Sequence, residues 1–152
     1  MITIHVFKGR AVALFGLGLS GIASAKALMA GGAGVAAWDD NEAAREAASG
    51  QGISVVDLND AAWTGFDALI LAPGVPLTHP EPHWTVKRAE ELGIEVIGDT
   101  ELFFRERERL GSQARVIAIT GTNGKSTTTA LTAHVLSDAG CDAVYGGNIG
   151  TA

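Results

Sequence analysis

The sequence predicts an α/β fold in which a Rossmann-like parallel sheet carries helices on both faces. Three observations support this prediction. Short apolar runs alternate with helical segments along the chain. The runs are apolar throughout rather than alternating with polar residues, as strands buried on both faces require. Two glycine-rich turns each follow such a run and each open a helix.

The first unit is predicted to contain five strands and four helices. Glycine or aspartate residues end most of the apolar runs, which marks them as short strands. Three of the helical stretches stop near glycine, the residue that most readily closes a helix C-terminus. In chain order the strands are 12–15, 35–38, 53–56, 68–71 and 95–97, and the helices are 20–30, 42–48, 83–92 and 100–110.

A second unit is predicted to begin after this sheet. Residues 1–110 form the first domain, 111–114 a linker, and 115–152 the start of a second domain. That start consists of a strand at 115–119, a glycine-rich turn and a helix at 126–139. Because one strand and one helix cannot enclose a core, we expect the second domain to be incomplete in this chain.

Composition excludes several classes of protein. The net charge of −6 and the pI near 5.1 argue against a nucleic-acid-binding surface, which needs clustered Lys and Arg. Cys141 is the only cysteine, so no internal disulfide can form. The sequence has no signal-peptide pattern and no apolar run of membrane-spanning length. These features predict a cytoplasmic protein that binds neither nucleic acid nor membrane.

The first glycine-rich turn has the pattern of a nucleotide-binding loop. Gly16-Leu17-Gly18-Leu19-Ser20-Gly21 is G-x-G-x-x-G, whose glycines allow a tight turn, a close approach to phosphate and helix–strand packing. Asp39 follows the second strand at about the ~20-residue spacing of a ribose-binding carboxylate. Gly74 follows the fourth strand at the same sheet edge. This pattern alone indicates a dinucleotide such as NAD; alternatively, Asp39 and Asp40 only cap the next helix.

The second glycine-rich turn, Thr120 to Thr127, indicates a phosphate-binding loop. Its sequence, Thr-Gly-Thr-Asn-Gly-Lys-Ser-Thr, departs from G-x-x-x-x-G-K-[ST] because the first glycine comes two residues late. Either the loop is a variant or Gly-Lys-Ser is a chance match. In a variant loop, Lys125 supplies positive charge to the β- and γ-phosphates and the Ser126 hydroxyl coordinates Mg²⁺.

Two further features favour structural interpretations. His79 and His83 have the spacing of a metal pair, but Pro80 and Pro82 make a regular helix there unfavourable, so we expect structural or surface roles. The alternating Arg and Glu residues of 105–109 are typical of a solvated helix face.

Five segments together resemble the Mur ligase family, the ATP-dependent amide-bond-forming enzymes of peptidoglycan synthesis. The similarity spans essentially the whole chain, as an N-terminal part of such an enzyme. The first and third segments favour the members that add D-glutamate to UDP-N-acetylmuramoyl-L-alanine, and the fourth is the family's own phosphate loop. The segments are 16–21, 72–80, 98–103, 119–127 and 146–150.

The resemblance changes the first expected ligand from NAD to the uridine diphosphate of the muramoyl substrate. Some family members carry an arginine on the uracil where this chain has Asn41. The expected contacts to the UDP-substrate are Gly18, Leu19, Ser20, Asp39, Asp40, Gly74 and Asn148. The expected contacts to ATP are Gly121, Thr122, Asn123, Gly124, Lys125, Ser126 and Thr127, with Lys125 catalytic and Ser126 a ligand of Mg²⁺.

The resemblance also implies a reaction. Such ligases convert the substrate carboxylate to an acyl phosphate, which the amino group of D-glutamate then attacks. The D-glutamate site and further metal ligands are expected beyond Ala152, so this chain alone is expected to be inactive. Three alternatives stay open: a NAD-binding oxidoreductase domain, a non-enzymatic nucleotide-sensing or assembly module, and a Mur ligase for another amino acid.

Overall fold

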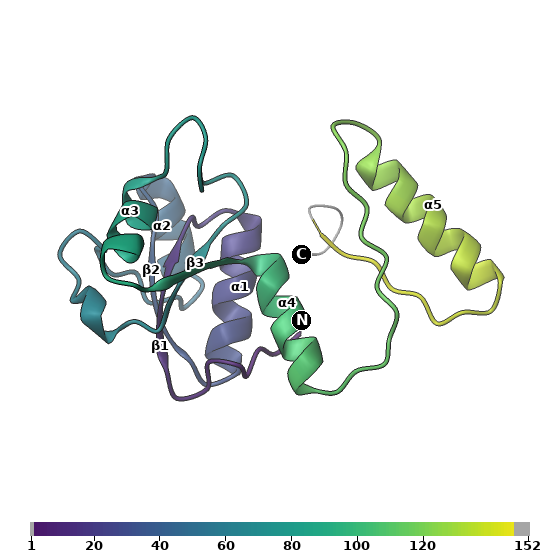
Figure 1. Ribbon diagram of the computed structural model, residues 1–152, viewed down its shortest axis with the longest axis horizontal. Helices are drawn as coiled ribbons and strands as arrows, with labels where there is room; N and C mark the ends of the chain where they lie inside the picture. Colours follow the sequence, from purple (N-terminus) through teal and green to yellow (C-terminus); the bar gives the residue numbers. More distant parts are fainter. Residues whose placement is uncertain (1, 148–152) are drawn as a thin grey trace. The chain divides into compact units, whose positions relative to one another are not determined.

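The computed structural model of the chain describes residues 2–147. The chain divides into two compact units, Met1–Ser112 and Gln113–Ala152. Figure 1 shows the sheet and its covering helices in the first unit and a single long helix in the second.

The first unit is built on a parallel four-stranded sheet. Its strands are β1 (Ala11–Phe15), β2 (Gly34–Trp38), β3 (Ala68–Leu71) and β4 (Glu95–Gly98), in the spatial order β2-β1-β3-β4. β1 is therefore central and adjoins both β2 and β3, and its last residue is aligned with the last residue of each. The strand order reverses direction at β1, which is where open α/β sheets bind ligands at their carboxyl edge.

The predicted strand at 53–56 is reduced to one bridge. Val55 pairs with Ala37 of β2, and the two supporting hydrogen bonds join Ala37 to Ser54 and Val56. This segment adds a short edge beside β2, too brief to count as a strand, because only Ala37 of β2 bonds to it.

Helices cover both faces of the sheet, as the sequence predicts. They are α1 (Leu19–Ala30), α2 (Glu42–Ser49), α3 (Trp84–Glu91) and α4 (Asp99–Arg109), with a short 3₁₀ helix η1 at Trp63–Gly65. Alternate residues of β1 divide between two cores: Val12 and Leu14 pack with α1 and α4, whereas Ala13 and Phe15 pack with α3 and η1. The central strands β1 and β3 are buried on both sides, which accounts for their unbroken apolar sequences.

A buried carboxylate of α4 holds the N-terminal segment through hydrogen bonds. The Glu106 side chain, 2% exposed, accepts hydrogen bonds from the backbone N–H groups of His5 (2.7 Å) and Val6 (3.2 Å) and pairs with Arg109 at 2.6 Å. Chiefly because of the Arg109 hydrogen bonds, the pKa of Glu106 falls from 4.5 to about 2. The expectation that 105–109 is a solvated face is wrong at Glu106, whose backbone donors His5 and Val6 lie about a hundred residues away in sequence.

The second unit contains α5 (Lys125–Asp138), close to the predicted helix. The predicted strand at 115–119 is absent: within residues 2–147 no strand lies there, because no neighbouring strand offers it hydrogen-bond partners. Apolar side chains of this unit are open to solvent, among them Ile117 (60% exposed), Leu131 (59%) and Val135 (57%). Among the helices described in either unit, none combines the length and apolar composition needed to cross a membrane.

Candidate functional site

The first glycine-rich turn is shaped by close packing. Gly16 has φ +98°, and a Cβ there would lie 2.6 Å from the Cβ of Ala72, at the end of β3. A Cβ on Gly21, in the first turn of α1, would lie 1.8 Å from the carbonyl oxygen of Gly16. Glycine is therefore required at both positions, and α1 starts directly against the carboxyl ends of β1 and β3.

Asp39 ties the end of β2 to this turn. Its Oδ2 accepts a hydrogen bond from the N–H of Leu17 at 2.6 Å, and its Oδ1 accepts one from the N–H of Asn41 at 2.8 Å. Asp39 therefore holds the glycine-rich turn in place, and only its remaining lone pairs are available to a ligand. The alternative that Asp39 and Asp40 cap α2 is wrong, since Asn41 does so by accepting from the N–H of Ala43.

Asp40 is the more open carboxylate. Its side chain is 64% exposed, and Oδ2 lies 3.5 Å from Nε2 of His83, the residue that precedes α3. The ring of His83 packs against that of Phe15, with centroids 4.2 Å apart. Residues from the ends of β1 and β2 and from the start of α3 thus meet at one place.

Arg45 reaches back from α2 to the same turn. Its Nη1 donates to the carbonyl oxygens of Asp39 (2.8 Å) and Asp40 (3.0 Å), and its guanidinium lies 4.3 Å from the ring centroid of Trp38. These bonds fix the backbone that presents both aspartates. A planar cation therefore lies beside the turn, although position 41 holds no arginine.

The N-terminus of α1 offers backbone donors at this edge. Gly18 precedes the helix without a side-chain cap, and the first turn of α1 contains no acidic residue. Leu19 is exposed, and the Ser20 hydroxyl donates to Oδ2 of Asp99, the first residue of α4. Uncapped N–H groups and the positive end of the helix dipole suit a phosphate group, which would compete with Asp99 for the Ser20 hydroxyl.

The loop after β3 completes this edge of the sheet. Gly74 has φ +145° and open space where a side chain would project. The neighbouring Val75 lies against the Gly16 turn, with 3.1 Å separating its Cγ2 from a Cβ built on that glycine. The structure thus brings together the turn at 16–20, the aspartates at 39–40 and the loop at 72–75.

The second glycine-rich turn has an open geometry. Gly124 (φ +76°) precedes α5, and no atom lies within 4 Å of a Cβ built on it. Lys125 Nζ donates to the carbonyl oxygens of Gly121 (2.5 Å) and Thr122 (3.3 Å), so the ammonium group curls over the turn. The side chains of Asn123, Ser126 and Thr127 are exposed. Exposed hydroxyls, an ammonium group and a helix N-terminus are the donor set that a Mg²⁺–triphosphate requires.

Comparison with known proteins covers all 152 residues. The chain is 60% identical to a UDP-N-acetylmuramoylalanine–D-glutamate ligase of Chelativorans sp. strain BNC1, and 59% identical to those of Rhizobium meliloti strain 1021 and Rhodopseudomonas palustris. The chain is thus similar over its whole length to UDP-N-acetylmuramoylalanine–D-glutamate ligases. It spans about a third of these relatives, 32%, 33% and 32% of their lengths respectively. No protein-family model matches it.

The predicted site residues fall into two sets in the structure. Gly18, Leu19, Ser20, Asp39, Asp40 and Gly74 lie together at the carboxyl edge of the sheet. The residues from Gly121 to Thr127 form the separate turn before α5. Asn148, predicted to contact the substrate, lies outside the described residues. Residues 2–147 contain no group of three or more His, Cys, Asp or Glu side chains able to hold a metal ion.

The sequence pattern predicted no role in the nucleotide site for three residues at the sheet edge. They are Arg45, His83 and Asp99, each of which bonds to or faces a predicted site residue. Only Arg45 has a local signal in the sequence. It lies in the first turn of α2, a few residues after the aspartates whose backbone it contacts. His83 and Asp99 reach the site only through the tertiary fold.

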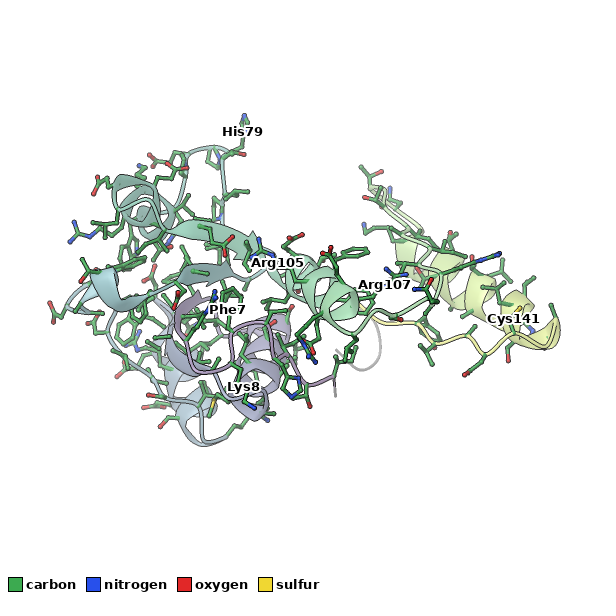
Figure 2. The ribbon with its side chains drawn as sticks, turned by 60° about the horizontal axis from the view of Figure 1, so that its bottom comes forward. Phe7, Lys8, His79, Arg105, Arg107 and Cys141 are labelled. Atoms are coloured by element: carbon green, nitrogen blue, oxygen red, sulfur yellow. The ribbon has the colours of Figure 1, made fainter. Side chains whose placement is uncertain are left out.

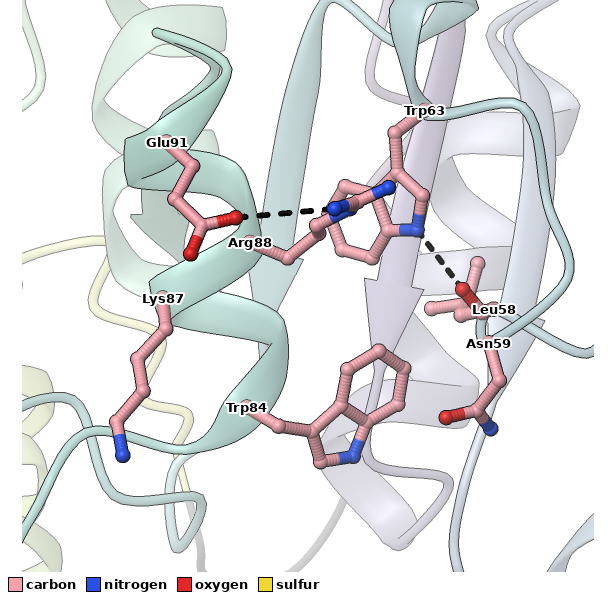
Figure 3. A pocket seen from close by; sticks show the side chains of 7 residues that line it. All are labelled: Leu58, Asn59, Trp63, Trp84, Lys87, Arg88 and Glu91. Atoms are coloured by element: carbon pink, nitrogen blue, oxygen red, sulfur yellow. Dashed lines mark hydrogen bonds and ion pairs between the residues drawn. The ribbon is translucent and has the colours of Figure 1, made fainter.

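A surface hollow of about 260 Å³ lies elsewhere on the first unit, between α3 and the segment at 58–63 (Figure 3). Trp63 and Trp84 form its apolar part, and its charged groups are paired, Arg88 with Glu91 at 3.7 Å and Lys87 with Glu81 at 3.1 Å. None of the predicted site residues lines it. The candidate nucleotide site of the first unit is therefore the sheet edge and not this hollow.

Proposed function

We propose that this chain is the N-terminal part of an ATP-dependent ligase that adds D-glutamate to UDP-N-acetylmuramoyl-L-alanine in cytoplasmic peptidoglycan synthesis. One observation carries the proposal: a chain about 60% identical to such ligases throughout its length brings Ser20, Asp40 and Gly74 to one sheet edge. That edge is where α/β proteins bind nucleotides. The uridine diphosphate of the substrate binds there, with its phosphates at the start of α1.

The second unit holds ATP in this proposal. Backbone N–H groups from Gly121 to Lys125 surround the phosphates, and Lys125 neutralises charge on the transferred phosphoryl group. Ser126 would bind Mg²⁺, whose role is to neutralise the phosphate oxygens. The substrate carboxylate takes the γ-phosphoryl group of ATP and ADP is released. The amino group of D-glutamate, which binds outside these 152 residues, then displaces inorganic phosphate from the acyl phosphate. We expect no D-glutamate-dependent release of ADP by this chain alone.

The choice between a uridine ligand and NAD is tested by calorimetric titration. UDP-N-acetylmuramoyl-L-alanine should bind the 152-residue chain and NADH should not. Binding of NADH alone would restore the oxidoreductase alternative, which the ligase relatives do not favour. Binding of neither would refute the proposal that the first unit holds the nucleotide by itself.

We expect the uridine ligand to bind this chain more tightly than Mg-ATP. The first unit encloses two apolar cores, whereas no residue of α5 is buried. A phosphate loop on an unburied helix is poorly fixed, so ordering it reduces affinity. Titration of the same chain with Mg-ATP tests this order. Tight ATP binding by a chain that ignored the uridine ligand would contradict it.

A further inference from the structure

His83 is fixed at the nucleotide edge by contacts on three sides. It precedes α3, and its Nδ1 accepts a hydrogen bond from the N–H of Thr85 at 3.4 Å, which caps the helix. Its ring packs on Phe15, the last residue of β1, and its side chain is only 17% exposed. Its Nε2 faces the carboxylate of Asp40 at 3.5 Å. The imidazole is therefore held by packing and capping, independently of any ligand.

Nδ1 of His83 faces two groups of Thr85, its backbone N–H at 3.4 Å and its hydroxyl oxygen at 2.9 Å. In the tautomer in which Nδ1 accepts from both groups, the neutral ring carries its hydrogen on Nε2. Within residues 2–147 no hydrogen bond occupies Nε2, which only approaches Asp40 at ion-pair distance. The edge of the site thus presents an N–H donor directly beside a carboxylate acceptor, and Asp40 is open enough to reach a ligand.

We propose that His83 and Asp40 together select uracil, so that His83 is a specificity-determining residue of the nucleotide site. The inference rests on the proposed function, which places a uridine nucleotide at this edge. Uracil carries an N–H donor at N3 next to a carbonyl acceptor at O4. Asp40 accepts from N3–H and Nε2–H of His83 donates to O4. Cytosine in the same position carries an acceptor at N3 and an amino donor at position 4, so both contacts oppose like groups.

The test compares binding of UDP and CDP to the 152-residue chain and to His83→Asn. Asparagine is a strong N-cap residue, so this change keeps the cap of α3 while removing Nε2. The matched control is His79→Asn, since His79 is exposed and lies on the loop before α3, away from the sheet (Figure 2). Circular dichroism of each variant checks that the fold is retained.

We expect the unaltered chain and His79→Asn to prefer UDP over CDP by roughly tenfold or more. His83→Asn should weaken UDP binding by roughly 5- to 10-fold and leave CDP binding within about twofold. Asp40→Ala should reduce the same preference, because it removes the other half of the pair. These selective losses would not arise from a purely structural role, which would weaken both nucleotides equally.

Two results would overturn the inference, and they differ from each other. An unchanged preference for UDP in folded His83→Asn would refute the role of His83 and leave the proposed function standing. No binding of UDP by the unaltered chain would refute the placement of the nucleotide at this edge, and the inference with it.

Discussion

The two glycine-rich turns of this chain have similar sequences, but their glycines are required for different physical reasons. At 16–21 the glycines are required by packing, because side chains at Gly16 and Gly21 would collide with the ends of β1 and β3. At 121–124 they are required by backbone conformation alone, since Gly121 (φ +150°) and Gly124 have almost nothing around them. The first turn is therefore part of a folded core, and the second is a surface loop.

The largest expected effect is that of Gly21→Ala. Alanine in a helix interior normally gains about 1 kcal/mol over glycine. Here its Cβ would lie 1.8 Å from the Gly16 carbonyl, so we expect a net loss of about 3 kcal/mol or more. Urea unfolding followed by tryptophan fluorescence measures it, because all three tryptophans lie in the first unit. Gly18→Ala is the control, with no atom near its Cβ; equal stability of both variants would contradict the packing argument.

Glu106→Gln tests the buried carboxylate that joins the N-terminal segment to α4. We expect the free energy of unfolding to fall by about 2 to 3 kcal/mol. Because the pKa of Glu106 is depressed to about 2, its stabilisation is full above pH 5 and is lost as pH falls towards 2. Unfolding free energies measured between pH 7 and pH 2.5 should therefore fall less steeply in the variant. Glu108→Gln, on the exposed side of α4, should keep the steep fall. Parallel pH profiles in all three proteins would exclude this role for Glu106.

Gly124→Ala should disturb only the second unit. The left-handed conformation costs a non-glycine residue about 1 to 2 kcal/mol, and here no packing collision adds to it. Faster hydrogen exchange at the amide of Thr128, which donates to the Gly124 carbonyl, reports the loss. The tryptophan-monitored unfolding midpoint should not move. Gly146→Ala serves as the comparison because its backbone is not left-handed, and a shifted midpoint in Gly124→Ala would show that the two units are coupled.

The smallest effect is expected for Leu131→Ala on α5. Leu131 is 59% exposed, so the change should alter stability by less than about 0.5 kcal/mol. The same truncation at Leu28, which is fully buried in α1, should cost about 3 kcal/mol. Calorimetric unfolding of both variants makes the comparison. A large loss at Leu131 would show that α5 is packed in solution.

Local sequence signals predicted most helices and strands of the first unit, because apolar runs and the glycines that follow them mark these elements in the sequence. Gly31 follows α1 and Gly50 follows α2, so glycine chemistry places helix C-termini to within a residue or two. Strands are harder, because a strand exists only where a neighbour bonds to it. The apolar runs at 53–56 and 115–119 have the composition of strands, yet the first forms one bridge and the second none.

The site was predictable only where a motif carried it. The glycine-rich turn and Asp39 have a fixed spacing, so the sequence placed them together. The bond of Asp99 to Ser20 and the approach of His83 to Asp40 join residues 79 and 43 positions apart. No local pattern encodes such pairs, and the two prolines beside His83 gave no indication of its partner.

The contact of Glu106 with His5 closes almost the whole first unit into a loop. A bond between residues 101 positions apart costs more chain entropy than any helix or neighbouring-strand contact, so it should form late in folding. It also places the two ends of the unit side by side, the arrangement that tolerates circular permutation. A version of residues 2–112 with joined ends and a new start in the exposed loop at 77–81 would keep every strand pairing of the sheet.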